Sequence, residues 1–299
     1  MLRLVLCSLA LLFLTGCGSD DNVTRGEEGR LQLGSEEART VVERSVRLGA
    51  RTLVIDAEVG SITVVGTDGE EAELRFEQVA RGSSATTAQK KLDRMSIEEA
   101  GDGEIYQYVV RTDDAEGTQV NIEARVPRAT PLQIGLENGS VRLSGTAGNI
   151  GVEAENGSIE AAGLAGQQVD LRTTLGNVEA GFAALSTEAD VRLETENGAV
   201  LLALPAEANA TVDARTQTGS ISVQGLGFTD RNLDEDGVSQ RFRGRLGQGG
   251  AKIRATTEVG TITLRDGHAR ELDGLVLDLF TPRDDTTVVP SGAPVAPTQ

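Results

Sequence analysis

The 299-residue chain is poor in the residues that most catalytic and metal sites use. It has no tryptophan, two tyrosines, two cysteines (Cys7 and Cys17) and a single histidine, His268. His268 stands in a polar stretch without a motif partner, and no G-x-S-x-G turn, P-loop or dinucleotide-binding glycine motif occurs between a strand and a helix. The composition therefore predicts no catalytic residues, no cofactor and no zinc site, and it indicates that the chain is not an enzyme.

Acidic residues dominate the charge of the chain. There are 46 Asp and Glu residues against 28 Lys and Arg residues, which gives a formal net charge of -18. A chain of this kind repels nucleic acid and anionic lipid headgroups, so we expect no nucleic-acid partner. The scarcity of aromatic rings also argues against a sandwich or a barrel, whose cores often contain them, and favours a narrow core of Val, Ile, Leu and Ala.

The N-terminus has the layout of a bacterial lipoprotein signal. A basic start precedes an apolar run over residues 4–14, which is too short to span a bilayer as a helix. The sequence LTGC at 14–17 resembles a lipobox, which implies removal of residues 1–16 and acylation of Cys17. The acyl chains would anchor the protein to a membrane. Because Gly18 stands where an aspartate would retain a lipoprotein at the inner membrane, we expect the cell envelope and, in a Gram-negative organism, the outer membrane.

Two segments without a periodic apolar pattern border a central domain. Residues 17–38 are polar, acidic and glycine-containing, which is typical of a flexible tether after the acylated Cys17. Residues 281–299 hold four of the seven prolines and are interpreted as a disordered tail. This leaves 39–280 as the folded domain.

Within the central domain, alternating apolar residues predict short β-strands. RTLVIDA at 51–57 and TQVNIEARV at 118–126 each place apolar side chains on one face. Only residues 83–95 favour a helix. Seven glycines mark a repeated turn-and-strand phrase, with a β-branched residue two positions later and an apolar residue four positions later. These predicted structural turns are Gly60, Gly139, Gly157, Gly176, Gly198, Gly219 and Gly260.

The spacing of the turns is typical of stacked coils. Consecutive glycines from Gly139 to Gly219 lie 18, 19, 22 and 21 residues apart, and a second apolar pair fits between successive turns. We predict an all-β fold, a β-solenoid (β-helix) of short stacked strands with about 18–22 residues per coil. An antiparallel β meander or sandwich is the alternative, because Asn-Gly pairs such as 138–139 also favour tight hairpins. Residues 225–250 are interpreted as an insertion.

The repeated phrases resemble those of a known family. NGSV at 138–141, NGSI at 156–159 and the closing GGAKIRATTEVGTITLRD at 249–266 are similar to the adhesin-like domains of the DUF4097 type, which are related to the head-GIN group. The resemblance covers roughly residues 50–266. It implies a β-helical fold on the bacterial cell surface or in the envelope, and it brings no catalytic residues to carry over.

Two acidic patterns are candidates for cation binding. In NLDEDG, the residues Asn232, Asp234 and Asp236 alternate like the first half of a calcium loop, but Arg243 stands where a bidentate glutamate is needed, so we favour a solvated acidic loop without metal. A second pattern lies two residues before the turn glycines, where stacking in register would form a ladder. Its members are Glu58, Glu137, Glu155, Thr174, Glu196, Gln217 and Glu258. We favour carboxylates that point into water over an edge that binds a divalent cation or a cationic partner.

The sequence favours a non-catalytic, envelope-anchored lipoprotein with a structural or adhesive role. Its partners would be the membrane, through the lipid on Cys17, and envelope proteins or glycans. The first alternative is a polysaccharide-acting β-helix enzyme, which acidic and basic side chains clustered on one solenoid face would support. The second alternative is an envelope-stress or assembly partner, which an exposed apolar patch on an end coil would support.

Overall fold

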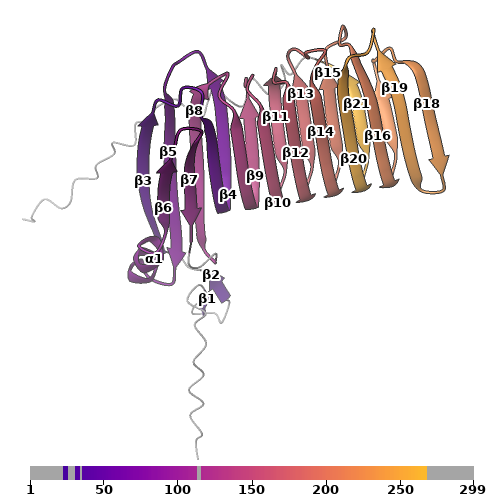
Figure 1. Ribbon diagram of the computed structural model, residues 1–299. Helices are drawn as coiled ribbons and strands as arrows, with labels where there is room; N and C mark the ends of the chain where they lie inside the picture. The colour runs from indigo at the N-terminus through magenta and orange to yellow at the C-terminus, as the bar shows by residue number, and fades with distance from the viewer. Residues whose placement is uncertain (1–22, 26–30, 34–35, 113–115, 268–299) are drawn as a thin grey trace, which may run out of the picture.

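The computed structural model describes residues 23–25, 31–33, 36–112 and 116–267. Within them the chain is almost entirely β-strand and forms a β-solenoid, which confirms the predicted fold class (Figure 1). The predicted signal (1–16), Cys17, His268 and the tail (281–299) lie outside the described residues. In the part of the chain that the structure describes, no helix is both long enough and apolar enough to cross a membrane.

Each coil contains two strands that meet at a corner glycine. The strands before the corners pair in parallel to form what we call the first sheet, and those after the corners form the second sheet. Two long strands, β4 (Thr52–Thr67) and β9 (Leu132–Ser144), continue through the corner and belong to both sheets. The other coils are β10 (Ile150–Asn156) with β11 (Ile159–Leu164), β12 (Gln168–Leu175) with β13 (Val178–Phe182), β14 (Asp190–Asn197) with β15 (Val200–Leu204), β16 (Ala210–Thr218) with β17 (Ile221–Gln224), and β20 (Ala251–Val259) with β21 (Ile262–Asp266).

The core lies between the two sheets and is built from the residues that the repeat predicts to face inward. The apolar residues at two and four positions after the corners, such as Ile62, Val141 and Leu202, are fully or almost fully buried. On β17, Ile221 and Val223 are only partly buried. Because every coil contributes the same small aliphatic shapes, the interior stays narrow and needs few rings.

The spatial order of the coils differs from their order in the sequence. Strand β20 pairs with β14 on one side and with β16 on the other (Figure 1). In the same way, β21 pairs with β15 and with β17. The last coil of the sequence is therefore inserted between two coils that follow each other in the chain. Spacing alone predicts neighbours in sequence order, because all coils have nearly the same length and pattern.

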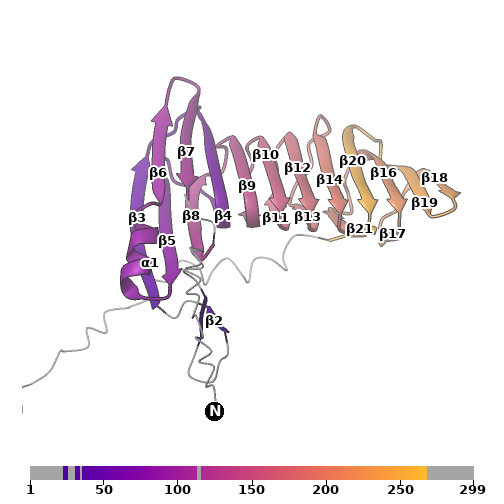
Figure 2. The same cartoon turned by 90° about the horizontal axis from the view of Figure 1, so that it is seen from below.

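Antiparallel strands and the helix occupy the N-terminal end of the solenoid (Figure 2). β7 (Ile105–Arg111) and β8 (Thr118–Pro127) pair in parallel with β4 as an additional coil, while β6 (Ser96–Gly101) pairs with β7. β5 (Ala72–Gly82) pairs with β8, and β3 (Glu36–Val46) pairs with β5. Helix α1 (Ala85–Leu92) lies within the predicted segment and starts at Ser84, whose hydroxyl accepts a hydrogen bond from the N–H of Thr87.

The segment interpreted as an insertion is an ordered hairpin at the other end. β18 (Thr229–Asp236) and β19 (Ser239–Leu246) are antiparallel, and β19 pairs with β16, so the hairpin extends the first sheet. The second sheet stops at β17 within the described residues. The expectation of a loop around NLDEDG is thus wrong, because Asn232, Asp234 and Asp236 all lie on strand β18, where they are exposed to solvent.

The tether expected over 17–38 also needs correction. β1 (Val23–Arg25) and β2 (Leu31–Leu33) form a two-stranded antiparallel sheet, and β3 already begins at Glu36. The early start of β3 has a packing reason, since the partly buried Ala38 and Val42 contact the core. The alternative of an antiparallel meander is excluded for the coils, because their strands are parallel and antiparallel pairs occur at the ends.

Candidate functional site

The seven predicted turn glycines form a continuous stack at the corners. A Cβ atom on any of them would overlap backbone atoms of the neighbouring coil; at Gly139 it would meet the carbonyl oxygen of Gly60, and at Gly157 that of Gly139. Five of the seven also have positive φ, between 143° and 154°. The requirement for glycine is therefore a close approach of backbones at every corner, in addition to the turn conformation that the sequence suggests.

A row of buried threonines supports four of these corners. Thr195 Oγ1 donates to the carbonyl oxygen of Gly176 at 2.8 Å, and Thr173, Thr257 and Thr216 make the equivalent bonds to the preceding coil in space at 2.8, 3.0 and 3.0 Å. The sequence analysis did not identify these residues. Their signal is nevertheless present, because a threonine stands three residues before the last four corner glycines, in TTLG, TENG, TQTG and TEVG.

The acidic ladder is present but interrupted. Register places Glu137 beside Glu155, with Thr174 following, and Glu196 beside Glu258. The charged positions from Glu137 onward are exposed to solvent. Among the described residues, no group of three or more His, Cys, Asp or Glu side chains is arranged to hold a metal ion. Two of the calcium candidates on β18 bind each other, through the 2.9 Å bond from Asn232 Nδ2 to Asp234 Oδ1.

The outer face of the first sheet carries a groove of about 770 Å³ across β4, β9, β10, β12 and β14. Gly135 and Gly151 occupy outward positions on adjacent strands and leave the backbone of the sheet uncovered there. Asp56 borders the groove, and its Oδ2 accepts a 2.9 Å hydrogen bond from Gln107 Nε2. The other charged and amide side chains that line the groove are Gln133, Asn149, Glu153, Gln168, Asp170, Arg172, Asp190 and Arg192.

The arginines of the groove are held by carboxylates on their own strands. Arg172 binds Asp170 through two bonds of 2.7 Å, and this contact raises the pKa of Arg172. Arg192 approaches Asp190 at 3.7 Å. The groove thus presents amides, fixed carboxylates and exposed backbone, which can donate and accept hydrogen bonds to a polyhydroxylated ligand.

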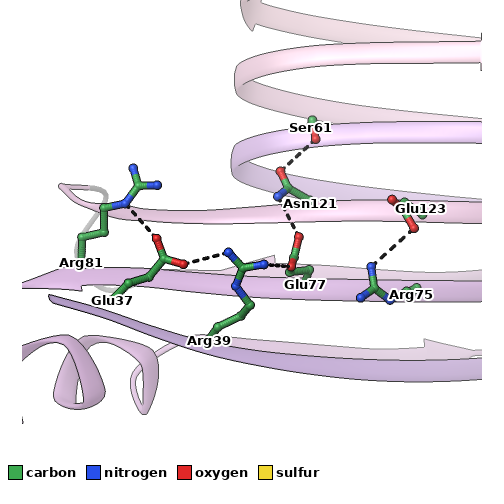
Figure 3. A network of polar contacts seen from close by, with 8 residues as sticks. All are labelled: Glu37, Arg39, Ser61, Arg75, Glu77, Arg81, Asn121 and Glu123. Atoms are coloured by element: carbon green, nitrogen blue, oxygen red, sulfur yellow. Dashed lines mark hydrogen bonds and ion pairs between the residues drawn. The ribbon is translucent and has the colours of Figure 1, made fainter. Parts of the chain in front are cut away.

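The outer face of the second sheet shows a different arrangement at its N-terminal end. Figure 3 shows a polar chain that crosses four strands there. Arg39 contacts Glu37 at 2.8 Å and Glu77 at 2.6 Å, Arg81 contacts Glu37 at 3.2 Å, and Asn121 links Glu77 to Ser61. The hydrogen bonds from Arg39 and Arg81 lower the pKa of Glu37. The network joins β3, β5, β8 and β4, so it fastens the N-terminal strands to the solenoid.

Comparison with known families identifies the fold. The model of the Toastrack DUF4097 family matches residues 45–265. The chain belongs to the Toastrack family. This confirms the resemblance seen in the repeated NGS phrases, and the match ends within β21, so it includes the inserted coil as well as the sequential ones.

Solved structures with related shapes come from several bacteria. A structure described as a "putative cell adhesion protein" from Clostridium sporogenes is 11% identical, with a TM-score of 0.43, and the match covers 77% of this chain and 100% of that one. A "putative adhesin" from Bacteroides fragilis is 11% identical with a TM-score of 0.36, covering 76% and 97%. A "putative lipid binding protein" from Parabacteroides distasonis is 9% identical with a TM-score of 0.29, covering 78% and 98%. No curated protein matches the Toastrack chain.

Proposed function

We propose that the chain is an envelope-anchored lipoprotein whose adhesin-like Toastrack domain binds ligands without catalysis, on the outer face of its first sheet. The observation that carries this proposal is the groove of about 770 Å³, which spans five neighbouring strands. Extended surfaces of this kind are how solenoid proteins bind their partners. The lipobox-like LTGC at 14–17 supports the anchoring, with Cys17 as the acylated residue.

The binding part of the proposal is tested by filling the groove. A side chain at Gly151 has room, because the nearest atom to a Cβ there is Gln133 Nε2 at 3.6 Å. We expect Gly151→Tyr to reduce the binding of labelled envelope fragments to the immobilised full-length protein. Ser222→Tyr, on the exposed outer face of β17, is the matched control and should bind normally. Equal binding by all three proteins would contradict a role for the groove.

The anchoring part is tested separately, by mass spectrometry of the mature N-terminus. We expect a lipid mass on Cys17 in the native chain, and we expect Cys17→Ser to release the protein from membranes into the soluble fraction. An unmodified Cys17 in membrane-extracted protein would contradict acylation. The same fractionation on a sucrose gradient tests the outer membrane as the destination, because the two membranes of a Gram-negative cell separate by density.

One observation favours a second candidate function. The groove gathers carboxylates and arginines on one solenoid face, which is the arrangement expected of a polysaccharide-acting enzyme. The pairing of Arg172 with Asp170 favours binding over catalysis, because the two side chains already neutralise each other's charge and share two hydrogen bonds. Incubation with acidic and neutral polysaccharides decides between them: release of shorter chains by the wild type but not by Asp56→Asn would support the enzyme.

The interaction-partner alternative has its own support at the C-terminal end. On the β18–β19 hairpin, Leu233 is 46% exposed and Val238 is 66% exposed. Crosslinking in living cells with the tagged, lipidated protein, followed by mass spectrometry, tests this alternative. Specific capture of an envelope protein that Leu233→Ser abolishes would favour an assembly role over a glycan-binding one.

A further inference from the structure

Besides Arg241 and Arg245, which bind Asp213 and Asp230, five cations gather on the outer face of the first sheet, beside the groove. They come from β14, β16, β19 and β20, strands that lie next to one another only because β20 is inserted between β14 and β16. Arg192 belongs to this group and also lines the groove, so the two surfaces are continuous. We call the group the basic patch, and its members are Arg192, Arg215, Arg243, Lys252 and Arg254.

The register of the strands fixes the spacing of the charges. Arg192 is paired with Arg254 on the next strand, Arg254 with Asp213, and Asp213 with Arg243. Neighbouring strands are about 4.8 Å apart, so a chain lying across them meets cations at spacings of one and two strands. Lys252 lies two residues before Arg254 on the same face, about 7 Å away along the strand.

Four of the five cations are left without an ion pair. Arg215, Arg243, Lys252 and Arg254 make no salt bridge with any residue that the structure describes. The carboxylate between Arg254 and Arg243 is Asp213, and both of its oxygens are bound by Arg241, at 3.0 and 2.5 Å. The other exposed carboxylates at outward positions of these strands and of β18 are Asp190, Glu194, Glu196, Asp230, Asp234, Asp236 and Glu258.

Stability does not account for the patch. Arg192 and Arg254 are directly opposite each other on neighbouring strands, and like charges in that position destabilise a sheet. The chain has 46 acidic residues with which to pair them, and the second sheet uses such residues around Arg39 and Arg81. Unpaired cations concentrated on one face of an acidic protein are the feature expected of an anion-binding surface.

We infer that the basic patch binds an acidic polysaccharide, that is, a glycan chain carrying carboxylate, sulfate or phosphate groups. This inference rests on the proposed function and gives the ligand its chemical class. The groove supplies amides, carboxylates and exposed backbone for the hydroxyl groups of the sugar, and the patch supplies guanidinium and ammonium groups for its charges. The phosphate groups of a membrane surface or a nucleic acid could pair with the cations. Neither offers the dense hydroxyl groups of a sugar chain to the hydrogen-bonding groove beside them.

The test compares dextran sulfate with neutral dextran on the immobilised full-length protein. We expect the wild type to bind dextran sulfate, with an affinity that falls as salt rises. Lys252→Gln combined with Arg254→Gln should weaken this binding about two- to thirtyfold, as for the loss of two exposed ion pairs. The matched control is Lys90→Gln combined with Arg94→Gln, which makes the same charge change at the exposed end of α1.

Each outcome of this experiment is decisive. If the control pair weakens binding as much as the patch pair, or if neither does, the inference is overturned. If the patch pair has no effect while Gly151→Tyr still reduces binding of envelope fragments, the groove function stands and the polysaccharide chemistry falls. If Gly151→Tyr also has no effect, both fall. Tighter binding of single-stranded DNA or of anionic vesicles, competing with dextran sulfate, would overturn the assignment to a polysaccharide. Unchanged thermal unfolding of the variants shows that folding is intact.

Discussion

Thr257 donates its hydroxyl hydrogen to the carbonyl oxygen of Gly198 at 3.0 Å, although the two residues are 59 positions apart in the sequence. The bond ties the last coil of the chain to the coil of β14 and β15. The coil of β16 and β17 is attached in turn to this inserted last coil, by the 3.0 Å bond from Thr216 to the carbonyl oxygen of Gly260. The buried threonines therefore follow the order of the coils in space.

Removing one of these hydroxyl groups should cost stability. We expect Thr195→Val to lower the free energy of unfolding by about 1–2 kcal/mol, because it keeps the shape but removes the buried bond to the carbonyl oxygen of Gly176. Chemical denaturation measures the change. Thr211→Val, at an exposed position on β16, is the control and should change little. Equal effects of the two substitutions would show that the buried bond contributes nothing specific.

Adding a single methyl group at a corner should be more damaging. Gly157→Ala would place its Cβ on the carbonyl oxygen of Gly139, so the backbones of two coils must separate, at a cost of about 3 kcal/mol or more. Gly103→Ala is the control, since nothing lies within 4 Å of a Cβ there. Thermal unfolding of both variants provides the measurement. A Gly157→Ala protein as stable as the Gly103→Ala protein would refute the close stacking of the corners.

The inserted coil should hold the C-terminal end in place. In a chain that ends at Gly250, β16 and β17 lose the strands that join them to the rest of the solenoid. We expect hydrogen exchange to become fast in β16 and in the β18–β19 hairpin, while β10 and β12 stay protected. If β16 stayed protected from hydrogen exchange in the shortened chain, β16 would be able to pair directly with β14, and the expectation would be wrong.

The ion pairs of Glu37 should contribute stability that depends on pH. Its carboxyl group has a lowered pKa in the folded protein, relative to an ordinary value near 4.5, because it accepts hydrogen bonds from Arg39 and Arg81. The charged form therefore stabilises the fold above about pH 4.5, and this contribution is lost as the pH falls through the lowered pKa. Since the side chain is 34% exposed, we expect less than about 1 kcal/mol.

Denaturation of Glu37→Gln at two pH values measures that contribution. The variant should be less stable than the wild type at pH 7, and the difference should disappear at pH 2. Glu70→Gln is the control, because Glu70 is exposed and makes no ion pair with the described residues. A difference between Glu37→Gln and the wild type that is the same at both pH values would rule out the charge as its cause.

Local repetition made the coil predictable from the sequence. Each corner glycine, such as Gly139, is followed by inward residues at fixed distances, and these positions depend only on short stretches of chain. The order of the coils was not predictable in the same way. Gly219 and Gly260 follow their strands with the same pattern, so the periodicity does not distinguish which of them stacks on Gly198.

The candidate binding face depends on that order, which explains why the sequence did not reveal it. Arg192, Arg243 and Arg254 lie far apart in the chain and become neighbours through the inserted coil. The groove was equally hidden, because Gly135 and Gly151 differ from the corner glycines in facing outward on the strands. The threonine row, in contrast, has a sequence signal, because the T-x-x-G repeats place a threonine at a fixed distance before four corner glycines.

The insertion of β20 and β21 also imposes a delay during synthesis. Solenoids can grow by adding each new coil to the one before it. Here β16 is synthesised before the strands that must lie between it and β14. At about 5–20 residues per second, the 41 residues from Thr218, the end of β16, to Val259, the end of β20, take roughly 2 to 8 seconds to emerge. During that interval β14 has no partner on the side that β20 will occupy, and any direct pairing of β14 with β16 would have to be undone before β20 could enter.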